Sequence, residues 1–341
     1  MEEDVVRVTT SRFSDYTCRA ANPEEYRYNA NVVESVNPKK MERRLTEQRN
    51  AASRNLDRMS SLEIITLMNR EDRKVADAVK RELPVIARAV DATVTQMRKG
   101  GRLIYVGAGS SGRMAVLDAA ECPPTFGISQ KQMLAVIAGG RRAVTGAVEG
   151  AEDSAANGER DLRKIRLTGN DVVVGICASG TTPYVLGAMR YTRKKKATAI
   201  AITSTRNMPV AKLAKIVIAV ETGPEVLTGS TRLKAGTAQK MVLNMLSTAV
   251  MVRLGHAHEN LMVDMTLSNQ KLAERAVRML AQASGARLST AGDALRQAQH
   301  SLRVALVMLK RGINAAEAKH RITASKGNLR RALEARSELN G

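Results

Sequence analysis

The segment Leu103-Ile104-Tyr105-Val106-Gly107-Ala108-Gly109-Ser110-Ser111-Gly112 decides the fold, because a short apolar run leads directly into a turn rich in glycine and serine. Such a run predicts a buried strand, and the residues that follow the turn predict a helix. A turn at the N-terminus of a helix presents backbone N–H groups and hydroxyls to an anion. The segment therefore predicts a phosphate-binding loop in an α/β fold.

The same loop pattern occurs again further along the chain. The segment Val174-Gly175-Ile176-Cys177-Ala178-Ser179-Gly180 aligns with residues 106–112 without a gap and shares the Val, Gly, Ser and Gly positions. Serine often does no more than cap a helix, but the repetition favours ligand binding. A third cluster, residues 223–234, also follows a predicted strand and contains three hydroxyl side chains and two cations. Together these loops predict a sugar-phosphate site.

Residues 107–112 also spell the G-x-G-x-x-G turn of dinucleotide-binding folds. Such a fold needs an acidic residue about 20 positions later, at the end of a second strand, to bind the ribose. This chain has Glu121-Cys122-Pro123-Pro124 there, and two prolines break a strand. The sequence therefore favours a sugar phosphate over a dinucleotide.

Short apolar runs that alternate with helix-length segments indicate an α/β fold, a parallel sheet with helices on both faces. Before the sheet, a capping box at Ser60 and Glu63 opens a helical pattern, and Pro84 predicts a kink or the start of a second helix. After the sheet, residues 238–254 have the apolar spacing of a long helix. The predicted strands are residues 103–106, 134–138, 172–176, 199–203 and 216–220.

Three parts of the chain are expected. Residues 1–43 are polar and irregular and form an N-terminal extension. Residues 44–284 form the sugar-phosphate-binding domain with its N-terminal helices. Residues 285–341 contain three short helical patterns and form a helical C-terminal domain.

The composition limits the partners. A formal net charge of +21 favours anionic ligands. The chain has six Tyr, two Phe and no Trp, without the aromatic platforms that stacking on nucleic acid requires, so nucleic acid is not expected. There is no apolar run of about 18 residues and no basic, signal-like start, so we expect a cytoplasmic protein that does not contact the membrane. The spacing of its three cysteines suggests neither a disulfide framework nor a zinc site.

Several strings resemble the signatures of a known family. From about Leu45 to its end, the chain resembles the sugar isomerase (SIS) fold and, within it, the N-acetylmuramic acid 6-phosphate etherases. The resemblance implies a parallel-sheet SIS domain followed by a small ubiquitin-associated-like helical domain. It also implies a lyase of peptidoglycan amino-sugar recycling, which cleaves a D-lactyl ether to give N-acetylglucosamine 6-phosphate and D-lactate. The strings are residues 100–105, 118–125, 147–153, 229–240 and 260–264.

The resemblance also implies an acid/base pair, with Glu121 as the proton donor and Glu152 as the base. In the open-chain sugar the ether at carbon 3 lies β to the aldehyde, so a base can remove the carbon 2 proton while an acid protonates the leaving oxygen. The residues alone do not say which glutamate is the acid, because burial sets the pKa of each. Proton transfer and hydrogen bonding suffice for this elimination, so no metal or organic cofactor is expected. The predicted substrate and phosphate contacts are Ser110, Ser111, Gly112, Ser179, Gly180, Thr182, Glu225, Thr228, Ser230 and Lys234.

One residue departs from the family pattern: Thr181 stands where the family usually has Arg. Arg113, Arg232 and Lys234 are the candidates to supply the missing positive charge. Because the helix after Thr237 is more apolar than one layer of sheet requires, and because sites in this fold resemble ones completed by a neighbouring subunit, we expect a homodimer.

Three other functions remain open at this point. A non-catalytic sugar-phosphate sensor of the glucokinase-regulator type is one, although a single SIS domain with both glutamates favours catalysis. A transcription regulator would need a helix-turn-helix unit before the sheet, and residues 1–60 offer no convincing one. An aldose–ketose isomerase would share the loops and the base but would release no lactate.

Overall fold

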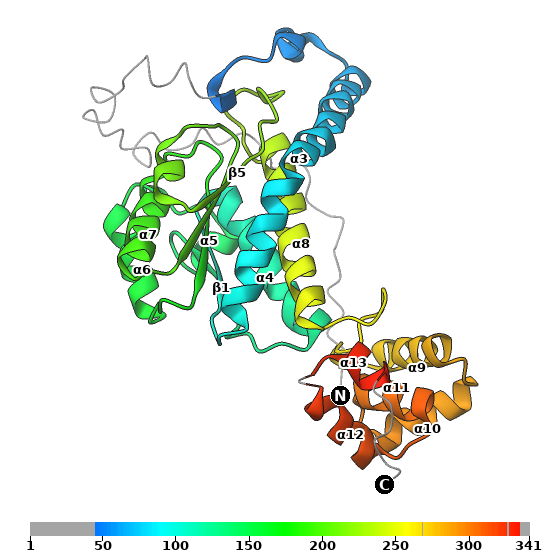
Figure 1. Cartoon of the computed structure of the whole chain (residues 1–341). Coiled ribbons are helices and arrows are strands. Elements are labelled where there is room, and N and C mark those ends of the chain that lie inside the picture. The colour runs from blue at the N-terminus through cyan, green and yellow to red at the C-terminus, as the bar shows by residue number, and fades with distance from the viewer. Residues whose placement is uncertain (1–44, 268, 326, 335–341) are drawn as a thin grey trace, which may run out of the picture. The chain divides into compact units, whose positions relative to one another are not determined.

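We describe a computed structural model of the chain, which covers residues 45–267, 269–325 and 327–334. Its centre is a five-stranded parallel sheet with strand order β2-β1-β3-β4-β5 (Figure 1). Each predicted strand is present, with both ends within one residue of the prediction. The predicted extension, residues 1–43, lies outside the described residues. The strands are β1 (Leu103–Gly107), β2 (Met133–Ile137), β3 (Val172–Ile176), β4 (Thr198–Thr203) and β5 (Ile216–Ala219).

Helices cover both faces of the sheet, as predicted. On one face, Tyr105 and Val174 pack against α3 (Ser61–Met97), α4 (Gly109–Phe126) and α8 (Lys234–Leu254). On the other face, Ile104 and Val173 pack against α6 (Ala155–Lys164) and α7 (Pro183–Lys194). Because both faces are covered, the central strands are continuously apolar and do not alternate apolar with polar residues. The short helices α5 (Arg142–Thr145) and η5 (Pro209–Leu213) lie in the connections.

The prediction that a second helix starts at Pro84 was wrong. The capping box at Ser60 and Glu63 is present, but it opens one helix of 37 residues, α3, that runs through Pro84. Proline costs a helix interior about 3 kcal/mol. Pro84 lies on the exposed side of α3, whereas Val79 and Ile86 on either side of it are buried in the same core. Burial of this shared stripe outweighs the lost hydrogen bond.

The C-terminal region is helical, as predicted. The helices α9 (Gln270–Ser284), α10 (Leu288–Gln297), α11 (Leu302–Arg311), α12 (Ala315–Ala324) and α13 (Leu329–Glu334) follow one another. They share an apolar cluster that includes Ala276, Leu295 and Leu306. A ubiquitin-associated-like arrangement and the domain boundaries at 43/44 and 284/285 stay predictions.

The order of the strands determines where a ligand site can form. Strand β1 pairs with β2 on one side and with β3 on the other, so the direction of winding reverses between β1 and β3. Ligands of open α/β sheets bind outside the carboxyl ends of the strands at such a reversal. Gly107 and Ile176 pair at these ends. Both predicted phosphate loops therefore begin side by side.

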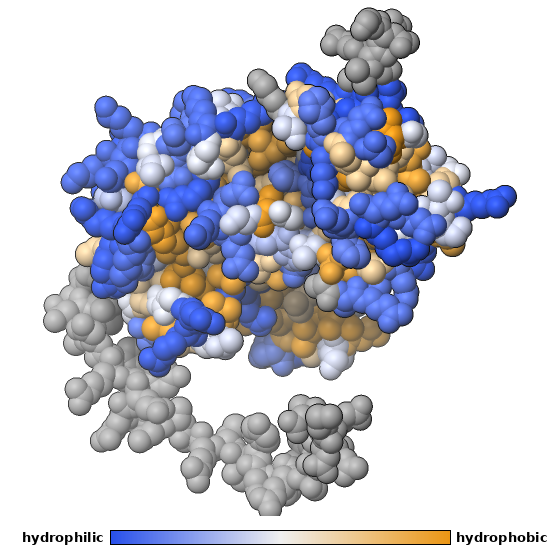
Figure 2. Space-filling view, turned by 90° about the horizontal axis from the view of Figure 1, so that it is seen from below, coloured by the Kyte–Doolittle hydropathy of each residue, from blue (hydrophilic) through white to orange (hydrophobic). Residues whose placement is uncertain are grey.

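Figure 2 shows one face, on which hydrophilic side chains predominate and apolar patches lie between them. Within the described residues, no helix has both the length and the apolar character needed to cross a bilayer.

Candidate functional site

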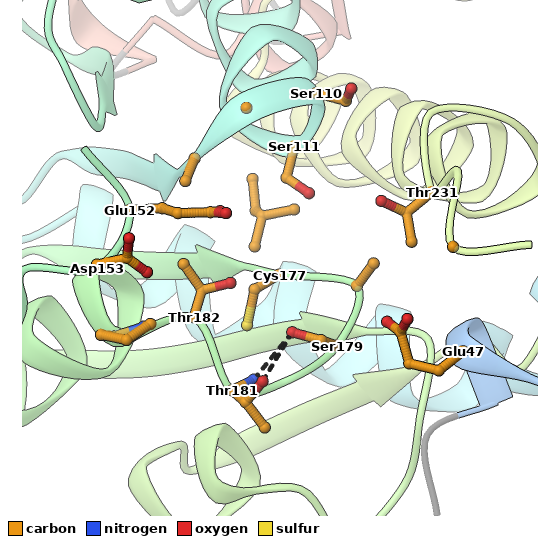
Figure 3. Close-up of a pocket in the computed structure, with 16 residues that line it drawn as sticks. Glu47, Ser110, Ser111, Glu152, Asp153, Cys177, Ser179, Thr181, Thr182 and Thr231 are labelled. Atoms are coloured by element: carbon orange, nitrogen blue, oxygen red, sulfur yellow. Dashed lines mark hydrogen bonds between the residues drawn. The ribbon is translucent and has the colours of Figure 1, made fainter. Parts of the chain in front are cut away.

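A cavity of about 590 Å³ opens where the strand order reverses (Figure 3). Both predicted loops line it, together with the end of the segment before α6, the loop after β5 and one residue of the N-terminal segment. The polar side chains among its 16 lining residues are those of Glu47, Ser110, Ser111, Glu152, Asp153, Cys177, Ser179, Thr181, Thr182 and Thr231.

The first loop is shaped by glycines. A Cβ atom at Gly107 would lie 2.8 Å from the backbone nitrogen of Gly112, and one at Gly112 would lie 2.5 Å from Cγ1 of Ile137. The strand can therefore turn sharply into α4 only without side chains at these positions. Gly112 is buried behind the loop and supports it, whereas Ser110 and Ser111 line the cavity.

The second loop has a similar construction. Gly180 has a φ of 69°, and a Cβ atom there would lie 2.4 Å from Cβ of Met208. The hydroxyl oxygen of Ser179 accepts hydrogen bonds from the backbone nitrogen of Thr181 at 3.2 Å and from its hydroxyl at 3.0 Å. The proton of Ser179 is then available to a ligand. Ser179, Thr181 and Thr182 line the cavity, and Gly180 supports them.

The two helices that begin at these loops have no side-chain caps. Neither Ala108, the N-cap of α4, nor Thr182, the N-cap of α7, accepts a capping hydrogen bond with its side chain. The serines of the loops therefore do not serve as N-caps. The positive ends of both helix dipoles are directed at the cavity, which suits a phosphate group.

Glu152 lines the cavity and points into it (Figure 3). Its backbone oxygen accepts a hydrogen bond of 2.9 Å from the backbone nitrogen of Tyr184, which fixes the segment before α6. The surrounding protein raises the pKa of Glu152 by burial, and the negative charges of Asp153 and Glu149 raise it further. A raised pKa makes the ionised carboxylate a stronger base.

The thiol of Cys177 also lines the cavity. Burial raises its pKa to about 11, so it remains protonated near neutral pH and is a poor nucleophile.

Glu121 does not line this cavity. It lies on α4, ten residues after Ser111, which is about 15 Å along a helix. There it lines a second cavity of about 360 Å³ between α4 and α8, with Asp118 and Lys240. A single chain therefore does not bring Glu121 and Glu152 together.

A hydrogen-bonded network lies behind Glu121. The buried carboxylate of Asp118 accepts hydrogen bonds from the hydroxyl of Tyr105 at 2.9 Å and from that of Ser247 at 3.1 Å. This network holds α4 against β1 and α8.

The loop after β5 contributes residues other than those predicted. Gly229 and Thr231 line the cavity, whereas Thr228 and Ser230 do not. Glu225 is buried and accepts hydrogen bonds from the backbone nitrogens of Lys234 at 3.0 Å and Ala235 at 2.9 Å, so its carboxylate caps α8.

Lys234 does not line the cavity either. Its ammonium group donates to the carboxylate of Glu71 at 2.7 Å, and both side chains are buried.

Two similar proteins carry the same name. A protein of Serratia proteamaculans (strain 568) named N-acetylmuramic acid 6-phosphate etherase is 51% identical over 289 residues, which cover 85% of this chain and 97% of that protein. The chain belongs to the N-acetylmuramic acid 6-phosphate etherase family. A relative of the same name from Yersinia pestis (strain Pestoides F) is 49% identical over 289 residues, covering 85% of this chain and 98% of that protein. The resemblance predicted from the motifs is confirmed.

Family models place the sheet region of this etherase-family chain in the SIS fold. The glucokinase regulatory protein N-terminal SIS domain matches residues 85–193, and the SIS domain matches residues 152–249. Among solved structures, a phosphoheptose isomerase from Francisella tularensis aligns with a TM-score of 0.44 and 17% identity, over 57% of this chain and 100% of that one. A phosphoheptose isomerase from Neisseria gonorrhoeae aligns with a TM-score of 0.42 and 17% identity, over 55% and 97%.

The polar lining residues of this etherase-family chain that were not predicted as site residues are Glu47, Asp153, Cys177, Thr181 and Thr231. Asp153 follows Glu152, and Thr231 lies in the third polar cluster, so both had a local signal. Glu47 had none, because its neighbours in the cavity lie more than 60 positions away in the sequence.

Proposed function

We propose that this chain cleaves the D-lactyl ether of N-acetylmuramic acid 6-phosphate and releases D-lactate and N-acetylglucosamine 6-phosphate. The observation that carries the proposal is 51% identity to a protein named as such an etherase, over 97% of that protein's length. The alternative of a non-catalytic regulator is not favoured, because the relatives at about half identity bear the enzyme's name.

The phosphate group is assigned to the two loops. Hydroxyls of Ser110, Ser111, Ser179 and Thr182, together with the uncapped starts of α4 and α7, offer hydrogen-bond donors to its oxygens. This binding leaves the sugar carbons near Glu152, which lines the same cavity as both loops.

The reaction proposed is an elimination followed by addition of water. The ionised carboxylate of Glu152 takes the proton from carbon 2, and the electron pair of that C–H bond forms the carbon 2–carbon 3 double bond as the carbon 3–oxygen bond breaks. A protonated Glu121 gives its proton to the ether oxygen, so lactate leaves with a hydroxyl group. Water then adds its oxygen to carbon 3 and gives one proton to the Glu121 carboxylate, and protonated Glu152 returns its proton to carbon 2, so both groups regain their starting states.

The two glutamates act together only if a second copy contributes one of them. Glu121 lies about 15 Å along α4 from the first loop. Beside it Leu117 is 49% exposed, and a second copy packed against α4 would cover it. We therefore propose a homodimer in which α4 of one copy brings Glu121 to the cavity of the other. Light scattering that finds only monomers at working concentrations would contradict it.

The direct test incubates the full chain with N-acetylmuramic acid 6-phosphate and measures D-lactate and N-acetylglucosamine 6-phosphate. Wild type is expected to release both in equal amounts, and Glu121→Gln and Glu152→Gln are each expected to lose activity by more than about 100-fold. No lactate from the wild type defeats the proposal.

A further inference from the structure

The N-terminal segment 45–50 is fastened across the loop that follows β5. The backbone oxygen of Thr46, which is 1% exposed, accepts a hydrogen bond of 3.2 Å from the backbone nitrogen of Gly229. The amide of Asn50 donates to the backbone oxygen of Pro224 at 3.2 Å. Both ends of this segment, which we call the strap, are therefore attached to the loop that supplies Gly229 and Thr231 to the cavity.

A second attachment fixes the strap to the helices. The amide of Asn50 also donates to the carboxylate of Glu71 on α3 at 3.0 Å, and the same oxygen accepts from Lys234 on α8 at 2.7 Å. Glu71 and Lys234 are buried. The strap is thus held by buried polar groups of two helices, and its position is set before any ligand arrives.

This fastening places Glu47 in the cavity wall. Its side chain is exposed, and the only hydrogen bond to its carboxylate among the described contacts comes from the hydroxyl of Thr46 at 3.3 Å. Figure 3 shows the carboxylate directed into the cavity from the side of the strap, with Glu152 directed into it from the other side. The carboxylate is free to accept further hydrogen bonds from a bound molecule.

The charges around the cavity restrict what Glu47 can contact. Three carboxylates, those of Glu47, Glu152 and Asp153, line the cavity, and none of its 16 lining residues, all within the described chain, is Lys or Arg. A phosphate next to Glu47 would meet an unscreened like charge. A neutral group with N–H or O–H donors would instead form charge-assisted hydrogen bonds, which are about twice as strong as neutral ones.

We propose that Glu47 is a specificity-determining residue that accepts hydrogen bonds from uncharged donors of the sugar, its hydroxyl or acetamido N–H groups. The inference rests on the proposed function and deepens it: the loops bind the phosphate, Glu152 faces carbons 2 and 3, and Glu47 selects a polyhydroxylated amino sugar at the remaining wall.

The test compares two ligands by isothermal titration of the full chain: N-acetylglucosamine 6-phosphate, and inorganic phosphate. Glu47→Ala is expected to weaken binding of the sugar phosphate by about tenfold, the usual loss for a hydrogen bond to a charged group. Glu47→Gln keeps one acceptor oxygen and is expected to lose less. Neither variant should weaken binding of inorganic phosphate, because the loops are unchanged.

Asp57→Asn provides the matched control, since Asp57 is an exposed acidic residue of the same N-terminal region that does not line the cavity. It should bind both ligands as the wild type does. Thermal unfolding of all variants checks that the strap remains folded. Equal affinity of Glu47→Ala and wild type for the sugar phosphate overturns the inference. Tighter binding of both ligands by Glu47→Gln also overturns it, because Glu47 would then face the phosphate.

The lactate assay separates this inference from the proposed function. If the wild type binds the sugar phosphate but releases no lactate, the etherase proposal is wrong. The affinities of the Glu47 variants for the sugar phosphate then still test the role of Glu47. A wild type that releases lactate, with a Glu47→Ala variant of unchanged affinity, defeats only the role of Glu47.

Discussion

The ammonium nitrogen of Lys234 lies 2.7 Å from a carboxylate oxygen of Glu71, and each side chain is at most 3% exposed. This contact joins the first turn of α8 to α3. Lys234 was a predicted phosphate contact, but its ammonium group is engaged in this ion pair instead. The two residues therefore support the cavity from behind its wall.

Removal of one partner of this pair should destabilise the fold. Lys234→Met leaves the carboxylate of Glu71 buried without its main partner, and breaking a buried pair costs about 3–5 kcal/mol. Urea unfolding measures the loss. Arg253→Met is the matched control, because Arg253 and Asp91 form an exposed pair at 3.0 Å, worth at most about 1 kcal/mol. A Lys234→Met chain that is as stable as wild type but fails to bind phosphate would show that Lys234 is a ligand after all.

The same pair predicts a loss of stability in acid. Burial alone would raise the pKa of Glu71, but hydrogen bonds from Lys234, Lys74 and Asn50 outweigh burial and lower the pKa to about 2 from 4.5. Because the folded-state pKa is the lower one, ionised Glu71 stabilises the fold above pH 4.5, and this contribution disappears as the pH falls toward about 2. Urea unfolding across this window should show a shallower pH dependence for Glu71→Gln than for wild type. Equal slopes for the two chains would contradict the prediction.

The acid limb of the activity profile should report the pKa of Glu152. A base must be ionised, so kcat/KM should fall as the pH drops below that raised pKa. Asp153→Asn removes a negative charge that raises it, so the limb should move to lower pH. Glu159→Gln is the control, because the carboxylate of Glu159 pairs with Arg163 on α6 and should leave the limb in place. If kcat/KM of Asp153→Asn falls at the same pH as that of wild type, Glu152 is not the base.

Arg113 should position Glu152 without contacting substrate. Its guanidinium donates to the backbone oxygens of Val144 at 3.2 Å and Gly146 at 2.7 Å, which ties the first loop to the turn that leads to Glu152. Arg113→Met frees that turn, and a displacement of about 1 Å can lower kcat about 100-fold. Titration with N-acetylglucosamine 6-phosphate should show affinity close to that of wild type. An unchanged kcat would show that the turn does not depend on Arg113.

The parts of the fold that were predictable have local causes. The strands β1 to β5 are short apolar runs, and the capping box at Ser60 and Glu63 is a contact between residues three positions apart. The loops at 107–112 and 177–180 were recognisable from local features, since a Cβ atom at Gly107 would clash with the backbone of Gly112 and Gly180 has a positive φ. In each case the deciding interaction lies inside the pattern that predicted it.

The features that were not predictable depend on distant contacts. Helix α3 continues through Pro84 because Val79 and Ile86 share one core, which no window of sequence reveals. Lys234 is directed away from the cavity by Glu71, 163 positions earlier. Glu47 enters the cavity because Thr46 pairs with Gly229.

Mixing two inactive chains tests the central claim most directly. Glu121→Gln and Glu152→Gln are co-refolded, and D-lactate release from N-acetylmuramic acid 6-phosphate is measured for each variant alone and for the mixture. If each cavity uses Glu152 of one copy and Glu121 of the other, mixed dimers contain one intact site, and an equal mixture recovers about one quarter of wild-type activity. A mixture that remains as inactive as the separate variants would contradict a site shared between two copies.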